Sequence, residues 1–190
     1  MRSERAEADG IEVCRRRSGG GLVWIDPATD CWIDLIVPAN SPLWHDDVGK
    51  SFHWLGETWA ETLSRTVAPA AQGQGWEAIV HRTSGRSPAG KVWCFADLGH
   101  GEVSIAGSKV VGLSQRRTRD WARLQCLVLG TWPTDRVGRY VDLDRALETI
   151  PVSTKDDLEP RSVMAGFPEG CPNPGPDRLT REFLAVLAQK

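Results

Sequence analysis

The clearest hydrophobic pattern in the chain lies between residues 46 and 67. Apolar side chains recur there at steps of three and four residues, at Val48, Phe52, Leu55, Trp59, Leu63 and Val67. This period places them on one face of an α-helix, and Asp46 or Asp47 can cap its start. We therefore expect an amphipathic helix over residues 46–67 with its apolar face against the core.

Short apolar runs separated by turn residues predict β-strands. The runs expected to form strands are residues 11–14, 22–25, 31–38, 76–82, 92–98 and 123–129. Residues 102–105 and 109–113 flank an Ala-Gly-Ser turn, a pattern that is typical of a hairpin. Hairpins mixed with a few helices favour an α+β fold, with a mainly antiparallel mixed sheet flanked by helices.

The rest of the pattern predicts two more helices and several loops. Residues 142–150 and 177–190 carry apolar side chains on one helical face, and Pro151 ends the first of these helices. The expected loops are residues 69–75, residues 83–90 and the proline-rich stretch 168–176, and the polar residues 1–10 are expected to fray. The length suits one globular domain over residues 1–190.

Composition disfavours several classes of protein. A net charge of −2 and a pI near 6.1 give no overall basis for a nucleic-acid or membrane-surface partner. No apolar run approaches the about 18 residues that cross a bilayer, and residues 1–10 lack the apolar core of a signal peptide, so we expect a cytoplasmic protein. The five cysteines lack zinc-like spacing, which predicts reduced thiols and no metal site.

The first candidate for chemistry is the tract Arg15–Gly21, which reads RRRSGGG and is called the glycine tract below. Glycine N–H groups can turn toward an anion, and the missing Cβ atoms let a ligand approach the backbone closely. Fixed positive charge beside such a backbone suits a phosphate or an adenylate. The alternative interpretation is a Ser/Gly turn beside solvated arginines.

The second candidate is Lys109, which follows the predicted hairpin turn in the run GSKVVGLSQRRTR at residues 107–119. A lysine fixed by a turn can be aimed at a carbonyl or carboxylate oxygen, whereas the alternative is a solvated strand lysine. Cys94 lies fifteen residues earlier, and a nearby cation would favour its thiolate, which can accept an acyl group as a thioester. The alternative for Cys94 is a small buried apolar side chain.

The two motifs together are more specific than either alone. RRxSGGGxV at residues 15–23 and GxKVxGxSQRRTR at residues 107–119 resemble the lipoate protein ligase and octanoyltransferase side of the biotin/lipoate A/B protein ligase family. The resemblance runs from about Val13 to Leu129. It implies a catalytic domain of the class II synthetase type, in a chain that lacks part of the family's N-terminal region.

The resemblance also implies roles for individual residues. Lys109 would contact the activated acyl group, and Cys94 with Phe95 matches a Cys-Phe pair of the cysteine-dependent octanoyltransferase branch. Ile25 stands where ligases commonly have histidine. The residues expected to line the acyl and nucleotide pocket are Arg16, Ser18, Gly19, Gly20, Gly21, Leu22, Val23, Trp24, Gly112 and Ser114.

The function that the resemblance implies is transfer of a lipoyl or octanoyl group to a specific lysine of a lipoyl carrier domain. The first interpretation is a ligase that forms an acyl-adenylate and needs ATP and Mg²⁺. The alternatives are an octanoyltransferase that uses a Cys94 thioester and needs neither, and a non-catalytic paralogue that binds an acyl group or a nucleotide. The implied partners are a lipoyl domain or a glycine-cleavage H-type protein as acceptor and an acyl carrier protein as donor. The acidic pI disfavours nucleic-acid binding through residues 15–17 and 116–119.

Overall fold

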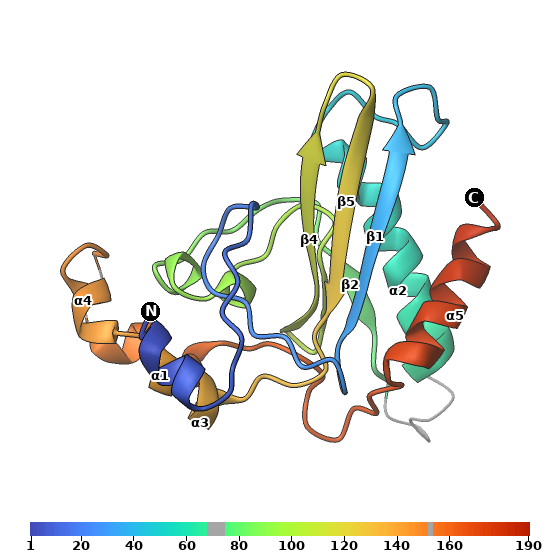
Figure 1. Cartoon of the computed structure of the whole chain (residues 1–190). Helices are drawn as coiled ribbons and strands as arrows, with labels where there is room; N and C mark the ends of the chain where they lie inside the picture. The colour runs from blue at the N-terminus through green and yellow to red at the C-terminus, as the bar shows by residue number, and fades with distance from the viewer. Residues whose placement is uncertain (68–74, 152–153) are drawn as a thin grey trace.

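The computed structural model describes residues 1–67, 75–151 and 154–190. Its framework is a five-stranded antiparallel sheet in the order β1-β5-β4-β3-β2, with α2 and α5 side by side on one face (Figure 1). The strands are β1 (Cys31–Pro38), β2 (Ala78–Val80), β3 (Val103–Ile105), β4 (Ser108–Arg117) and β5 (Trp121–Val128). The helices are α1 (Ser3–Ala8), α2 (His53–Val67), α3 (Thr134–Val137), α4 (Leu143–Leu147) and α5 (Pro176–Leu187). The expected α+β class with a mainly antiparallel sheet is confirmed.

The longest antiparallel pairings in the sheet are those of β5 with β1 and with β4. Cys126 lies opposite Ile33 of β1 and Leu113 of β4. Successive side chains of β5 alternate between the two faces, so Cys126 and Val128 point toward α2 and α5 whereas Leu127 points away from them. A slip of one residue would exchange these faces, and burial therefore fixes the register.

The main core lies between the sheet and the α2/α5 layer. Trp59 of α2 stacks on Phe183 of α5 with ring centroids 4.3 Å apart, and both side chains are fully buried. Leu55 and Leu63 lie one helical turn before and after Trp59 and are also buried. The apolar period from Leu55 to Val67 therefore faces the core as expected, whereas Val48 lies before the helix and is exposed.

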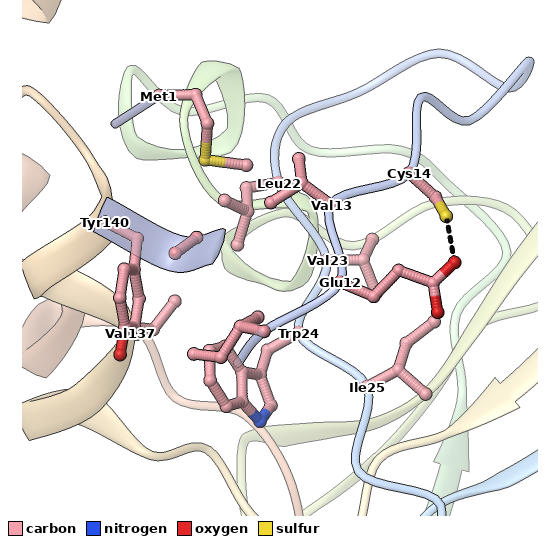
Figure 2. A pocket seen from close by; sticks show the side chains of 12 residues that line it. Met1, Glu12, Val13, Cys14, Leu22, Val23, Trp24, Ile25, Val137 and Tyr140 are labelled. Carbon is pink, nitrogen blue, oxygen red and sulfur yellow. Dashed lines mark hydrogen bonds between the residues drawn. The ribbon is translucent and has the colours of Figure 1, made fainter. Parts of the chain in front are cut away.

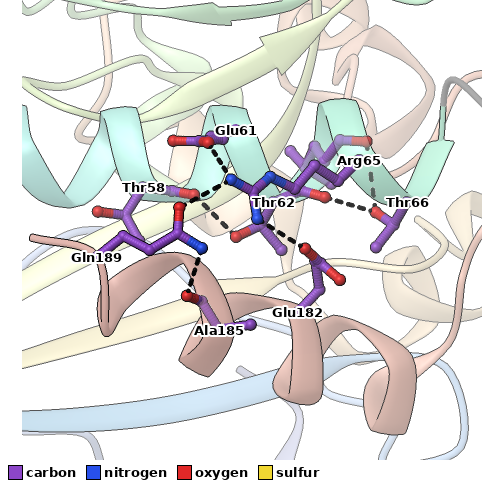
Figure 3. Close-up of polar contacts among 9 residues, drawn as sticks. Thr58, Glu61, Thr62, Arg65, Thr66, Glu182, Ala185 and Gln189 are labelled. Atoms are coloured by element: carbon purple, nitrogen blue, oxygen red, sulfur yellow. Dashed lines mark hydrogen bonds and ion pairs between the residues drawn. The ribbon is translucent and has the colours of Figure 1, made fainter.

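Polar contacts also tie α2 to α5 (Figure 3). The guanidinium of Arg65 donates to Glu61 on its own helix and to Glu182 and Gln189 from the C-terminal part of the chain. The buried hydroxyl groups of Thr58, Thr62 and Thr66 each donate to the backbone carbonyl four residues earlier in α2. The helix can therefore carry polar side chains into the packed layer without leaving these hydroxyls unpaired.

A second core covers the opposite face at the end of β5. It contains Leu127 and Leu129 together with apolar side chains from residues 92–95 and 137–163. The fully buried Trp93 anchors it, because its indole N–H donates to the Leu158 carbonyl at 2.7 Å. This second layer positions the segments that carry the candidate site.

The first helix begins later than the apolar pattern predicted. Residues Lys50–Phe52 form a 3₁₀ turn, and α2 begins at His53 rather than at residue 46. An Asp47 carboxylate oxygen accepts the Lys50 backbone N–H at 2.9 Å, in a turn that contains Gly49. Side-chain acceptors and glycine favour such turns over continued helix, which explains the difference.

The predictions of three strands and of a frayed N-terminus were wrong. Residues 11–14, 22–25 and 92–98 form no strand, and Leu22 and Trp93 make an isolated parallel bridge instead. Their apolar side chains fill the second core from loops and 3₁₀ turns, which a short apolar run cannot distinguish from a strand. Residues 3–8 form α1 because Ala6 is buried and the Arg2 backbone N–H donates to the Tyr140 carbonyl at 2.8 Å.

The other predicted elements differ from the observed ones mainly at their boundaries. The hairpin is formed by β3 and β4, and β2 is shorter than residues 76–82. Helix α4 occupies the middle of residues 142–150, and α5 begins at Pro176, the last residue of the expected proline-rich loop. The predicted loop at residues 69–75 lies almost wholly outside the described residues. No helix in the described part of the chain combines the length and the apolar composition needed to cross a bilayer.

Candidate functional site

The end of the glycine tract packs directly against the backbone of residues 92–94. The Leu22 N–H donates to the Val92 carbonyl at 2.6 Å, and the Cys94 N–H donates to the Leu22 carbonyl at 2.9 Å. A Cβ atom at Gly21 would lie 2.3 Å from the Val92 carbonyl group, so only glycine permits this approach. Gly20 has a φ of +94°, which also favours glycine.

Arg16 folds back over the glycine tract. Its Nη1 donates to the Ser18 hydroxyl at 3.0 Å and its Nη2 donates to the Gly21 carbonyl at 2.6 Å. The arginine therefore holds the shape of the loop from within. Arg15 is exposed beside it and adds a second positive charge at the same cavity.

A cavity of about 470 Å³ joins the two sequence motifs, and it is called the acyl cavity below after the ligand that the family resemblance implies. The predicted site residues that line it are Arg16, Ser18, Gly19, Gly20, Gly21, Leu22, Val23, Cys94, Gly112 and Ser114. Apolar side chains of Phe95, Leu113 and Leu127 complete much of the wall. The fold therefore brings the glycine tract to the middle of β4, although about ninety residues separate the two in the chain.

Trp24 lies outside the acyl cavity. It lines a smaller neighbouring cavity of about 180 Å³ beside α1 (Figure 2). There its ring stacks on Tyr140 at a centroid distance of 6.1 Å, and the Arg136 guanidinium lies 5.2 Å from the ring centroid. The structure thus keeps Trp24 out of the acyl cavity, whereas Leu22 and Val23 line both cavities.

Lys109 lies behind the wall of the acyl cavity rather than in its lining. Its side chain is buried, and its ammonium lies 4.9 Å from the centroid of the Phe95 ring. The Nζ atom donates to the Asp97 carbonyl at 2.7 Å and to the Cys94 carbonyl at 3.3 Å, and it pairs with Glu102 at 2.6 Å. An ammonium has three N–H donors, so these three acceptors use all of them. Lys109 therefore fixes the 3₁₀ turn Cys94–Ala96 to β4.

Glu102 is the charged site residue that the sequence interpretation missed. One carboxylate oxygen accepts the Gly99 N–H at 2.6 Å and pairs with Lys109, and the other accepts the Leu113 N–H at 3.0 Å. Glu102 also lines the acyl cavity. The available signal was an acidic residue directly before the apolar strand β3, close to a lysine that was already a candidate.

The five thiols differ in their surroundings. Cys94 faces the glycine tract, because its Sγ lies 3.1 Å from the position that a Cβ on Gly20 would occupy. Burial raises the pKa of Cys126 to about 12, and burial also raises the pKa values of Cys31 and Cys171. A hydrogen bond to Glu12 raises the pKa of the exposed Cys14. These four thiols are therefore protonated at neutral pH, and Cys94 is the thiol placed where the two motifs meet.

The chain matches a known protein family over most of its length. The family model of the lipoyl protein ligase A/B catalytic domain matches residues 2–155. A comparison with curated proteins found no match. Among the described residues, no group of three or more His, Cys, Asp or Glu side chains is placed to hold a metal ion.

Several solved structures share the fold. A bipartite lipoate protein ligase from Thermoplasma acidophilum, studied with its E2 lipoyl domain, matches with a TM-score of 0.60 at 15% identity, over 98% of this chain and 60% of the other. A putative lipoate protein ligase from T. acidophilum with bound lipoic acid matches with a TM-score of 0.56 at 15% identity, over 98% of this chain and 62% of the other. A lipoate-protein ligase A bound with ATP gives 0.50 at 16% identity, over 98% and 63%.

The present chain thus spans about three fifths of the length of these solved structures. At 15–16% identity, these matches show that the fold is alike and nothing more. The family match, in contrast, extends over most of the chain and includes both motifs that line the acyl cavity. This protein therefore belongs to the lipoyl protein ligase A/B catalytic domain family.

Proposed function

We propose that this protein transfers a lipoyl or octanoyl group to a lysine of a lipoyl carrier domain, and that Cys94 holds the group as a thioester. The observation that carries the proposal is the position of the Cys94 thiol against Gly20, inside the cavity that both motifs line. The fold match to a ligase that was studied with a lipoyl domain supports the choice of acceptor. Acyl carrier protein is the proposed donor, and an H-type protein is a further acceptor of the same kind.

The proposed reaction has two balanced steps. In the first, the Cys94 thiolate attacks the carbonyl carbon of an acyl thioester, the new carbon–sulfur bond forms, and the donor sulfur leaves and takes up the proton that Cys94 released. In the second, the acceptor lysine attacks as a neutral amine, a carbon–nitrogen bond forms, and the bond to Cys94 breaks. The proton lost by the amine passes to the departing sulfur. This route requires neither ATP nor Mg²⁺.

The surrounding residues supply position and charge. Leu22, Val23 and Phe95 offer an apolar wall against which a medium-length acyl chain can pack. Lys109 is a positioning residue in this arrangement, because its ammonium holds the carbonyl groups of Cys94 and Asp97. Its ammonium lies behind Phe95 and is paired there with Glu102.

A second candidate is a ligase that activates the free acid with ATP and Mg²⁺. The fold match to an ATP-bound lipoate-protein ligase favours it, and the exposed Arg15 and the open space at Gly19 suit a phosphate. Arg16 fits that role less well, because two of its N–H groups are committed to Ser18 and Gly21. The described residues offer no ready cluster of ligands for Mg²⁺, so the ion would depend mainly on the phosphates of the nucleotide.

The two routes can be separated with purified protein and an apo lipoyl domain. We expect octanoyl acyl carrier protein to acylate the domain without ATP, and we expect intact-mass analysis to find one octanoyl group on the enzyme. Cys94→Ser should abolish both signals. Cys171→Ala is the matched control, because this buried cysteine lies away from the acyl cavity and should leave both signals unchanged.

Two results would contradict the thioester route. Acylation by octanoate and ATP that persists in Cys94→Ser would establish the ligase instead. Binding of octanoate in a thermal-shift assay without turnover under either condition would indicate a non-catalytic member of the family.

A further inference from the structure

A second cavity, of about 630 Å³, lies where the start of α2 meets the loop after β2. It shares Glu102 and Leu113 with the acyl cavity, and the rest of its lining is different. We propose that this second cavity binds a phosphate group. The proposal is independent of the proposed function, because it assigns no step of acyl transfer to the cavity.

The lining is rich in positive charge. Lys50, Arg82 and Arg86 line the cavity together with Asp47 and Glu102. Both carboxylates already have donors: Asp47 accepts the Lys50 backbone N–H, and Glu102 pairs with Lys109. Because the buried Lys109 neutralises Glu102, the local balance is positive.

Lys50 and Arg86 have the uncommitted charges. Arg82 pairs with Glu57 at 2.5 Å. Neither the Lys50 ammonium nor the Arg86 guanidinium takes part in a hydrogen bond or ion pair with another described residue. Two cationic groups from separate segments, one beside α2 and one after β2, can therefore approach the same anion.

Two imidazole rings provide the second observation. His53 Nε2 and His100 Nδ1 are buried, and within the described residues neither has a hydrogen-bond partner. The rings face the same cavity with their centroids 5.9 Å apart. A buried polar nitrogen without a partner costs free energy, and an oxyanion bound beside the two rings would offer both nitrogens an acceptor, since an imidazole can donate through either nitrogen.

The arrangement of donors favours phosphate over a carboxylate. A guanidinium, an ammonium and two imidazoles reach the cavity from three separate segments, and a tetrahedral oxyanion can accept from all of them at once. A planar carboxylate presents only two oxygens in one plane. The cavity is larger than a single phosphate, so the group can be either free phosphate or the phosphate end of a larger molecule.

Isothermal titration at constant ionic strength tests the site with two probes, inorganic phosphate and glycerol 3-phosphate. We expect saturable binding of one equivalent to the wild type and at least about tenfold weaker binding to Lys50→Gln/Arg86→Gln. Arg178→Gln/Lys190→Gln removes two exposed charges elsewhere and should bind like the wild type. Absence of saturable binding, or equal affinity in the two double variants, would overturn the proposal.

A spectroscopic readout locates the bound group. Phosphate should shift the imidazole nitrogen resonances of His53 and His100, assigned with His53→Gln and His100→Gln, more than those of His81, which is bonded to Ser104. Unshifted resonances at saturation would sink the proposal. Tighter binding of the monoester would identify a phosphate borne on a larger molecule, and tighter binding of inorganic phosphate would identify the free ion; both results support the site.

Discussion

The Nζ atom of Lys109 lies 2.6 Å from a carboxylate oxygen of Glu102, and both side chains are almost completely shielded from water. Burial of two ions is costly, and the cost is offset only when each charge has good partners. Here two backbone N–H groups complete the shell of Glu102, and two carbonyl oxygens complete that of Lys109. The pair therefore fixes the turn that carries Cys94 relative to β4.

Removal of one partner should expose how much this pair contributes. Glu102→Gln would leave the Lys109 ammonium buried without a counter-charge, and we expect the free energy of unfolding to fall by about 3–5 kcal/mol. Urea unfolding measures the change. Glu57→Gln is the control, because it breaks the exposed pair with Arg82 and should cost less than about 1 kcal/mol. If both variants lost a similar amount of unfolding free energy, the buried pair of Lys109 and Glu102 would contribute no more to stability than an exposed ion pair.

Two glycines of the same tract should respond very differently to alanine. A Cβ at Gly21 would lie 2.6 Å or less from backbone atoms of Val92 and Trp93, whereas a Cβ at Gly19 would have no neighbour within 4 Å. We expect Gly21→Ala to lower the free energy of unfolding by roughly 1–3 kcal/mol and to reduce acyl transfer, because the wall of the cavity must shift. Gly19→Ala should change stability little. Equal thermal midpoints for the two variants would contradict this packing.

The sequence predicted those helices and strands that bury one face against the core and leave the other face exposed. The period of α2 and the runs of β1 and β5 were identified because a half-buried helix or strand repeats at 3.6 or 2 residues. Residues 22–25 and 92–98 were misread as strands because they supply the second core from loops. Packing between distant segments decides their conformation, and a local pattern does not contain that information.

The site was predictable to a similar extent. The motif resemblance grouped the glycine tract with Gly112 and Ser114, and all of these residues except Arg17 line one cavity. The burial of Lys109 was not predictable, because its partner Glu102 becomes a neighbour only through the β-bulge of the hairpin and the turn at Gly99. Trp24 lies only three residues after the tract, yet it turns toward Tyr140 because α1 and α3 create a separate apolar environment there.

Thiol reactivity should distinguish Cys94 from Cys126, which is buried in strand β5. Burial raises the pKa of Cys126 to about 12, so this thiol remains protonated at every pH at which the folded protein is normally handled. In a Cys14→Ser background at about pH 8, we expect a maleimide to label Cys94 first and Cys126 only after denaturation. Peptide mass analysis identifies the labelled residue. Labelling of Cys126 in the folded protein at a rate similar to that of Cys94 would contradict the assignment.

The pH dependence of stability should carry a contribution from His53. Burial lowers the pKa of this imidazole below its ordinary value of 6.5, and the positive charges of Arg82 and His100 lower it further. The unfolded chain therefore binds more protons than the folded chain below about pH 6.5, so the contribution is present above that pH and is lost as the pH falls through the folded pKa. His53→Gln removes the titration, and we expect its thermal midpoint to fall less than that of the wild type between about pH 7.5 and about pH 5.5. An equal or larger fall in His53→Gln would show that the imidazole is protonated as easily in the folded protein as in the unfolded chain.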